Sequence, residues 1–119
     1  MKQMEKIAAG EHFSAVDAGK MAQLGEYRLQ LAPGVELPGK VFGGAAVGAT
    51  GAEFSFQSFA PGTETGFLHT HRTHEELYFF LSGRGEFQVD GKCFTVGEGS
   101  VVRVAPAGRR SVRNNGSEP

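Results

Sequence analysis

Two histidines and a glutamate in the middle of the chain have residue types and a spacing that could bind a metal. His69 and His71 are two residues apart, so on an extended strand their side chains project from the same face. Glu76 follows at the start of an apolar, aromatic segment. Two imidazoles and one carboxylate form a ligand set that Zn, Fe, Mn or Ni can use. The sequence therefore predicts a divalent-metal site at this point of the chain.

The segments around this group have the turn pattern of an all-β domain. Glycine makes up 18 of the 119 residues, about twice its usual share, which favours tight turns over long helices. In the second half of the chain, short strand-like segments alternate with turn residues at the spacing of a β-sandwich or barrel. These turn residues are Pro61-Gly62, Gly83, Gly85, Asp90-Gly91, Gly97, Gly99, residues 106–108 and Asn115-Gly116.

Asp90-Gly91 is the strongest hairpin signal, because both central residues of a type I′ turn need a positive φ. Folding the chain back across this turn pairs Val89 with Lys92 and Phe87 with Phe94. The two phenylalanines then lie on one apolar face, and polar residues occupy the other. The sequence predicts a half-buried hairpin with this register.

We expect a single domain over residues 1–119, with an N-terminal arm and loop over residues 1–40 and a barrel core over residues 50–119. Short strands are expected before Gly10 and over residues 26–31. Residues 33–51 are dense in glycine and small side chains and are interpreted as a loop with short extended pieces. Residues 53–59 alternate in polarity, which predicts a half-buried strand of the barrel core.

Composition excludes several classes of partner. A formal net charge of −1 gives no basic surface for nucleic acid or an anionic membrane. The N-terminal residues lack the apolar segment of a signal peptide, and no stretch is long enough to cross a bilayer. The single cysteine, Cys93, excludes an intrachain disulfide and suits a reducing compartment. We therefore expect a cytoplasmic protein that binds neither nucleic acid nor membrane.

Two motifs resemble those of the cupin superfamily of small β-barrel proteins. The first cupin motif places a glycine before His-x-His, then a glutamate and, six residues later, a second glycine. Its counterparts here are Gly62, residues 69–71, Glu76 and Gly83. The second motif combines a glycine, Pro-x-Gly, a histidine and an asparagine. Its counterparts are Gly99, residues 106–108, Ser111 and Asn115.

This resemblance implies an all-β, cupin-type jelly-roll β-barrel whose metal ligands are His69, His71 and Glu76. The fourth ligand would be the histidine of the second motif, where this chain has Ser111. A neutral hydroxyl is a poor ligand beside imidazole and carboxylate. Three alternatives stay open: a three-ligand centre with open positions, replacement of the missing ligand by His74, or a pocket without metal that binds its ligand by hydrogen bonds.

A pocket for a small-molecule ligand is expected at the barrel mouth, bordered by Tyr78 and Phe80. Polar groups for it could come from Gln57, His74 and Ser111. The rings of this region, Phe79 included, are also expected to pack in the core. Cupins include both enzymes and binding proteins, so the resemblance leaves two functions open. The chain would be a metal-dependent enzyme acting on a small oxygenated or carboxylated metabolite, or a non-catalytic ligand-binding or accessory cupin with a degenerate metal site.

The printed sequence ends soon after the second motif, at residues 116–119. Cupins usually continue with one more strand, and a sheet edge left open tends to pair with another chain. We expect either a longer protein or an edge that a partner chain covers. In the second case the N-terminal arm would cross over in a homodimer.

Overall fold

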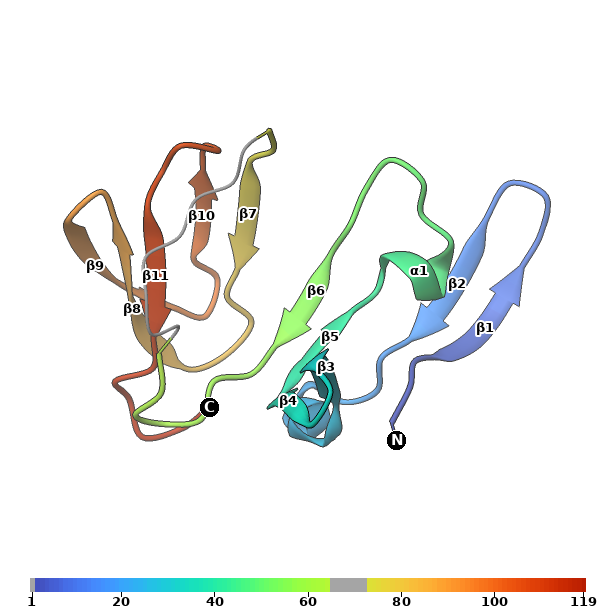
Figure 1. Cartoon of the computed structure of the whole chain (residues 1–119), viewed down its shortest axis with the longest axis horizontal. Coiled ribbons are helices and arrows are strands. Elements are labelled where there is room, and N and C mark those ends of the chain that lie inside the picture. Colours follow the sequence, from blue (N-terminus) through green and yellow to red (C-terminus); the bar gives the residue numbers. More distant parts are fainter. Residues whose placement is uncertain (1, 65–72) are drawn as a thin grey trace. The chain divides into compact units, whose positions relative to one another are not determined.

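The computed structural model describes residues 2–64 and 73–119, so His69 and His71 lie outside the described residues. The chain divides into two compact units, Met1–Ser58 and Phe59–Pro119, and each is described by itself (Figure 1). Strands dominate both units, which confirms the predicted all-β class. Among the described residues, no helix has the length and apolar character needed to span a membrane.

The N-terminal unit consists of three antiparallel strand pairs and two short helices. Its elements are β1 (Glu5–Ala9) with β2 (Ser14–Asp17), the 3₁₀ helix η1 (Met21–Glu26), β3 (Arg28–Ala32) with β4 (Val35–Pro38), β5 (Lys40–Phe42) with β6 (Ser55–Gln57), and α1 (Gly44–Val47). Leu24 and Tyr27 are its buried apolar side chains. The strands expected before Gly10 and over residues 26–31 are confirmed by β1 and β3.

Two features of this unit differ from the sequence interpretation. Residues 33–51 contain the single-turn helix α1, which ends at Gly48 in the left-handed conformation, with φ of 73°. One helical turn is too short to give an apolar repeat of period 3.6, so the pattern could not reveal it. β6 forms as predicted but pairs with β5 and belongs to the N-terminal unit. Alternation identifies a strand but not the strand that pairs with it.

The C-terminal unit places two sheets on either side of a small apolar core (Figure 1). One sheet pairs β7 (Glu76–Phe79) with β10 (Val101–Val104), and the other has the order β11-β8-β9, with β8 (Arg84–Val89), β9 (Lys92–Gly97) and β11 (Arg110–Arg113). Glu64 forms an isolated antiparallel bridge with Arg113 of β11. Two sheets facing each other across a core are typical of a jelly roll.

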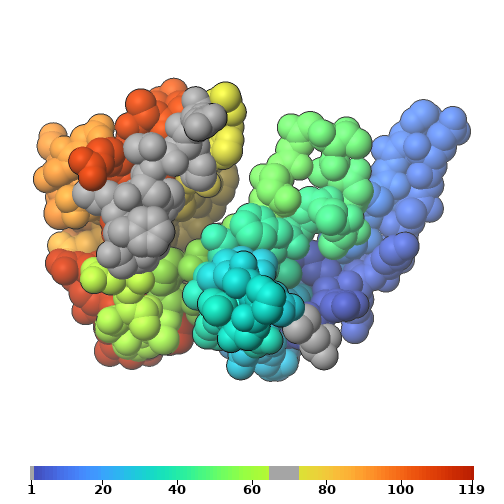
Figure 2. Space-filling view, in the orientation of Figure 1, coloured from blue at the N-terminus to red at the C-terminus, as the bar shows by residue number. Residues whose placement is uncertain are grey.

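The predicted hairpin at Asp90-Gly91 is confirmed together with its register. Val89 pairs with Lys92, and Phe87 pairs with Phe94. Asp90 has a φ of 52° and Gly91 a φ of 82°, the two positive values that a type I′ turn requires. This hairpin forms the β8 and β9 strands of the three-stranded sheet, and orange atoms of β9 are visible at one edge of the unit in Figure 2.

Phe87 is the centre of the core and is almost completely buried. The ring of Tyr78 meets it edge to face at a centroid distance of 4.9 Å, and the ring of Phe80 does the same at 6.2 Å. The ring of Phe94 stacks on that of Phe87 at a centroid distance of 5.8 Å. The expectation that Phe79 packs in the core was wrong, because it lies on the opposite face of β7 and is 62% exposed.

Gly85 fixes the distance between β8 and β11, so we predict that Gly85→Ala destabilises the C-terminal unit. A Cβ atom at this buried position would lie 2.5 Å from the backbone oxygen of Arg113, and a backbone atom cannot move aside cheaply. The expected loss is about 1–3 kcal/mol of unfolding free energy, measured by urea denaturation. Gly97→Ala is the matched control, since its nearest neighbour outside the adjacent residues lies at an ordinary 3.5 Å. Equal losses in both variants would contradict the prediction.

Candidate functional site

Glu76 and Tyr78 lie on the inward side of β7, and Glu75 lies on the outward side. The Tyr78 hydroxyl donates a hydrogen bond to Oε1 of Glu76. Oε2 of Glu75 instead accepts a hydrogen bond from Nε of Arg103 at 2.7 Å, and both side chains are exposed. The period of two along a strand therefore separates the two neighbouring glutamates into different environments.

The charged partner of Glu76 is Arg110, the first residue of β11. Nη1 of Arg110 lies 3.0 Å from Oε1 of Glu76. The Arg110 side chain is only 1% exposed, whereas that of Glu76 is 33% exposed. The ion pair thus joins the two sheets of the unit, since β7 belongs to one and β11 to the other.

Three backbone carbonyls of the turn before β11 also accept hydrogen bonds from Arg110. Nη2 donates to the carbonyl oxygen of Ala105 at 2.8 Å, of Gly108 at 3.0 Å and of Pro106 at 3.2 Å. Nε donates to the Gly108 oxygen at 3.1 Å. A guanidinium has five N–H donors in a rigid plane, and here they bind a carboxylate and a turn together.

Ser111, which the second motif places at the missing ligand position, lies on the other face of the sheet. It pairs with Gln88, and Gln88 pairs with the exposed Cys93. Arg110 pairs with Val89, which packs against the core. Arg110 is therefore the residue of β11 that faces Glu76, a role that motif counting missed. Arg110 and Val112 are two residues apart on β11, so their side chains lie on the same face of the strand, and Val112 packs against the core. The apolar character of Val112 is the signal that could have identified Arg110 as inward-facing.

The buried asparagine after β11 is Asn114, while Asn115, the motif counterpart, is exposed. The Asn114 side chain donates to the carbonyl oxygens of Phe59 and Glu118, at 2.8 Å each, and accepts from the backbone N–H of Gly116. Its backbone N–H donates to the carbonyl oxygen of Thr63. Asn114 thus connects the start of the unit, the end of β11 and the C-terminal residues.

The Tyr78 phenol is held in its neutral form. Burial, followed by the hydrogen bond to Glu76, raises the pKa of Tyr78 well above its ordinary value of 10.0. The phenol therefore remains a hydrogen-bond donor to the carboxylate at all physiological pH values. The site combines one carboxylate, one guanidinium and one phenol beside an aromatic core.

The remaining predicted site residues are not all brought together. Phe80 borders Tyr78 through their shared contact with Phe87. His74 is exposed in the segment before β7, and Gln57 is exposed on β6 of the N-terminal unit. The metal ligands predicted at His69 and His71 lie outside the described residues.

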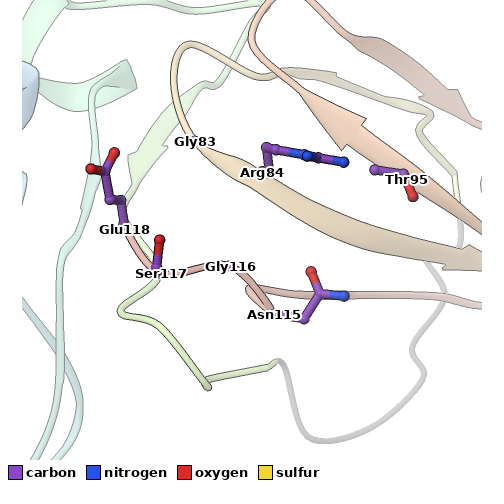
Figure 3. A pocket seen from close by; sticks show the side chains of 7 residues that line it. All are labelled: Gly83, Arg84, Thr95, Asn115, Gly116, Ser117 and Glu118. Atoms are coloured by element: carbon purple, nitrogen blue, oxygen red, sulfur yellow. The ribbon is translucent and has the colours of Figure 1, made fainter.

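Two cavities of the C-terminal unit are lined by residues other than Glu76 and Tyr78. One of about 400 Å³ lies between the start of β8 and the C-terminal residues, and in Figure 3 the Arg84 side chain extends toward Thr95 while Glu118 points away. The other, of about 130 Å³, is lined by Ser111, Gln88, Cys93 and the exposed pair Glu86 and Arg113, together with Glu64 and Phe87.

Among the described residues, the predicted metal ligand is Glu76, and its surroundings disfavour a divalent metal at one of its two oxygens. Its Oε1 atom already accepts hydrogen bonds from a guanidinium and a phenol. A metal ion bound there would also lie beside the buried positive charge of Arg110, and like charges repel strongly at short range in a partly buried site. Within residues 2–64 and 73–119, no cluster of three or more His, Cys, Asp or Glu could hold a metal.

Comparisons with known proteins identify a family for the second half of the chain. A family model described as "Cupin domain" matches residues 55–119. An uncharacterized protein of Methanocaldococcus jannaschii is 36% identical over 52 residues, which are 44% of this chain and 42% of that protein. The match therefore spans about two fifths of the relative's length.

Solved structures show the same fold. The crystal structure of a cupin protein from Bacteroides fragilis superposes with a TM-score of 0.62 at 29% identity, covering 74% of each chain. A protein from Thermotoga maritima, described as a predicted oxalate decarboxylase, gives a TM-score of 0.59 at 24% identity, covering 77% of this chain and 82% of that chain. At that identity the second likeness concerns the fold alone.

We predict that Arg110→Met lowers the unfolding free energy by about 3 kcal/mol, because it removes the buried guanidinium that binds the Glu76 carboxylate and three backbone carbonyls of the turn. Arg103→Met is the matched control: it breaks a pair of similar length at an exposed position and should cost less than about 1 kcal/mol. Chemical denaturation of both variants tests this. Similar losses would show that burial does not distinguish the two pairs.

Tyr78→Phe should reduce stability at neutral pH by about 1.5 kcal/mol, because the hydrogen bond to a charged carboxylate is lost. The effect should shrink at alkaline pH. The pKa of Tyr78 is higher in the folded protein than its unfolded value of 10.0. The stabilisation is therefore fully present below pH 10.0 and is lost as the pH rises from there through the pKa of the folded state. Denaturation curves of wild type and variant should therefore converge above about pH 10. A constant difference across this range would contradict the prediction.

Proposed function

Because the chain belongs to the cupin family, we propose that it is a small-molecule-binding protein whose ligand binds beside Glu76 and Tyr78 without a metal-dependent reaction. One observation carries this proposal: the carboxylate of Glu76 is paired with the buried guanidinium of Arg110. A carboxylate can accept hydrogen bonds at both of its oxygens, and the positive charge of a neighbouring guanidinium disfavours a second cation beside it. The expected ligand is a small oxygenated or carboxylated metabolite, bound in the cytoplasm.

The geometry at Glu76 supports a binding role. Its side chain is one-third exposed, although its hydrogen-bond partner Tyr78 packs against Phe87 in the core. Ligand sites commonly combine an apolar, aromatic wall with a few polar groups of fixed orientation. Here Arg110 and Tyr78 fix the orientation of the carboxylate, which reduces the entropy that ligand binding must overcome.

A metal-dependent enzyme is the second candidate, favoured by the spacing of His69, His71 and Glu76 in the sequence. The two candidates differ in metal content. Protein purified without a histidine tag should contain far less than one Zn, Fe, Mn or Ni per chain if the first proposal holds. About one metal ion per chain, lost in His69→Ala, would favour the enzyme and contradict the metal-independent function.

The binding function predicts that a small oxygenated compound binds in the presence of EDTA. Glucose, whose hydroxyl groups can donate hydrogen bonds to the carboxylate, is a suitable probe, tested by isothermal titration calorimetry. Glu76→Gln should weaken the binding of a probe that binds wild type by about tenfold, because it removes a charge-assisted hydrogen bond. Glu75→Gln is the matched control on the opposite face of the same segment and should leave affinity unchanged.

Two results would contradict the proposal. Binding that appears only after addition of a divalent metal would favour the second candidate. Equal effects of Glu76→Gln and Glu75→Gln would show that the ligand does not bind beside Glu76.

A further inference from the structure

We propose that Asn115 is a deamidation site protected by native hydrogen bonds, so that its conversion to aspartate or isoaspartate reports the loss of these contacts. The inference goes beyond the binding function, because it concerns a covalent change of the chain itself. Asn115-Gly116 is the single Asn-Gly pair of the sequence. Asparagine is a thermolabile residue, and a following glycine, which has no Cβ, hinders its reaction least.

The reaction requires the backbone nitrogen of Gly116 and a water molecule. The nitrogen loses its proton and attacks Cγ of Asn115. The bond from Cγ to the side-chain nitrogen breaks, ammonia leaves with that proton, and a succinimide ring remains. Water then adds to either ring carbonyl and opens the ring to aspartate or isoaspartate. One water is consumed and one ammonia is released, and no atom is oxidised or reduced.

Water can reach the Asn-Gly pair in the folded protein. Both Asn115 and Gly116 are exposed, and both line the cavity of about 400 Å³ beside the start of β8 (Figure 3). Burial therefore does not protect Asn115. Protection must come from the hydrogen bonds that hold the two reacting groups.

One of these hydrogen bonds holds the attacking nitrogen. The backbone N–H of Gly116 donates to Oδ1 of Asn114 at 2.9 Å. The Asn114 side chain is buried and is itself fixed, because its Nδ2 donates to the carbonyl oxygens of Phe59 and Glu118. The proton that must leave Gly116 is thus bound by a rigid acceptor. Its loss would break this hydrogen bond, which raises the barrier to attack.

A second hydrogen bond holds the group that is attacked. Nδ2 of Asn115 donates to Oε1 of Glu86 on β8 at 3.0 Å. The same oxygen accepts a hydrogen bond from Nε of Arg113 at 2.8 Å, so the carboxylate is anchored to β11 as well. A charge-assisted hydrogen bond of this kind restricts the Asn115 side chain, and fewer of its conformers bring Cγ to the Gly116 nitrogen.

Peptide mass spectrometry of protein kept at mildly alkaline pH tests the proposal, because deamidation replaces a side-chain NH₂ by OH and raises the peptide mass. Fragmentation of the peptide distinguishes Asn115 from Asn114. Native Asn115 should react about tenfold more slowly than in protein unfolded in guanidinium chloride, because both hydrogen bonds are lost on unfolding. In the unfolded chain, Gly116→Ala should react severalfold more slowly than wild type, since a Cβ hinders ring closure.

Glu86→Ala tests the role of the second hydrogen bond. The folded variant should deamidate about fivefold faster than folded wild type, because the acceptor of the Asn115 amide is removed. Glu98→Ala is the matched control: it removes an exposed glutamate of the same unit and should leave the rate unchanged. Circular dichroism shows whether each variant is folded. If Glu86→Ala does not fold, the comparison of native and unfolded wild type still decides the question.

The proposal is overturned by any of three results. Equal rates in native and unfolded wild type would show that the native contacts give no protection. Equal rates in folded Glu86→Ala and folded Glu98→Ala would show that the hydrogen bond to Glu86 has no effect. Equal rates in unfolded Gly116→Ala and unfolded wild type would exclude the attack by the residue 116 nitrogen. None of these measurements involves an organic ligand, so failure here is separate from failure of the binding function.

Discussion

The described part of the C-terminal unit is held together across its two sheets by an ion pair between a buried guanidinium and a half-buried carboxylate. Arg110 and Glu76 are the charged residues that meet across the edge of the core, and the same guanidinium closes the turn at residues 105–108. A buried charge is tolerated only when it is paired and its hydrogen bonds are satisfied. The position of β7, the start of β11 and the conformation of the turn between β10 and β11 are therefore coupled through one side chain.

Local sequence patterns predicted much of this unit because its strands are short and clearly bounded. The Asp90-Gly91 turn fixed the register of β8 and β9, since a two-residue turn leaves only one way to pair the flanking residues. The period of two along a strand accounts for the opposite faces on which Glu76 and Glu75 lie. These features involve neighbours in sequence, so the residue types alone determine them.

Features that depend on distant parts of the chain were beyond such patterns. Counting from the Pro-x-Gly turn selected Ser111, while the fold turns Arg110 inward, and a shift of one residue on a strand reverses the face. No local pattern predicts the pairing of β6 with β5, because a strand's partner is decided by tertiary packing. Nor does the sequence reveal that Asn114, rather than Asn115, makes the buried contacts with Phe59 and Glu118.

The β8–β9 hairpin has a consequence for the order in which the C-terminal unit folds. Its contacts join residues close in sequence, so the entropy lost in closing this loop is small and the hairpin can form within microseconds. The contact between Arg110 and Glu76 spans 34 residues and requires both sheets to be in place. We therefore expect the hairpin to form early in folding and the ion pair to form late, so that the ion pair mainly slows unfolding. On this expectation, the local contacts of the β8–β9 hairpin govern the rate of folding, and the ion pair between the sheets governs the rate of unfolding.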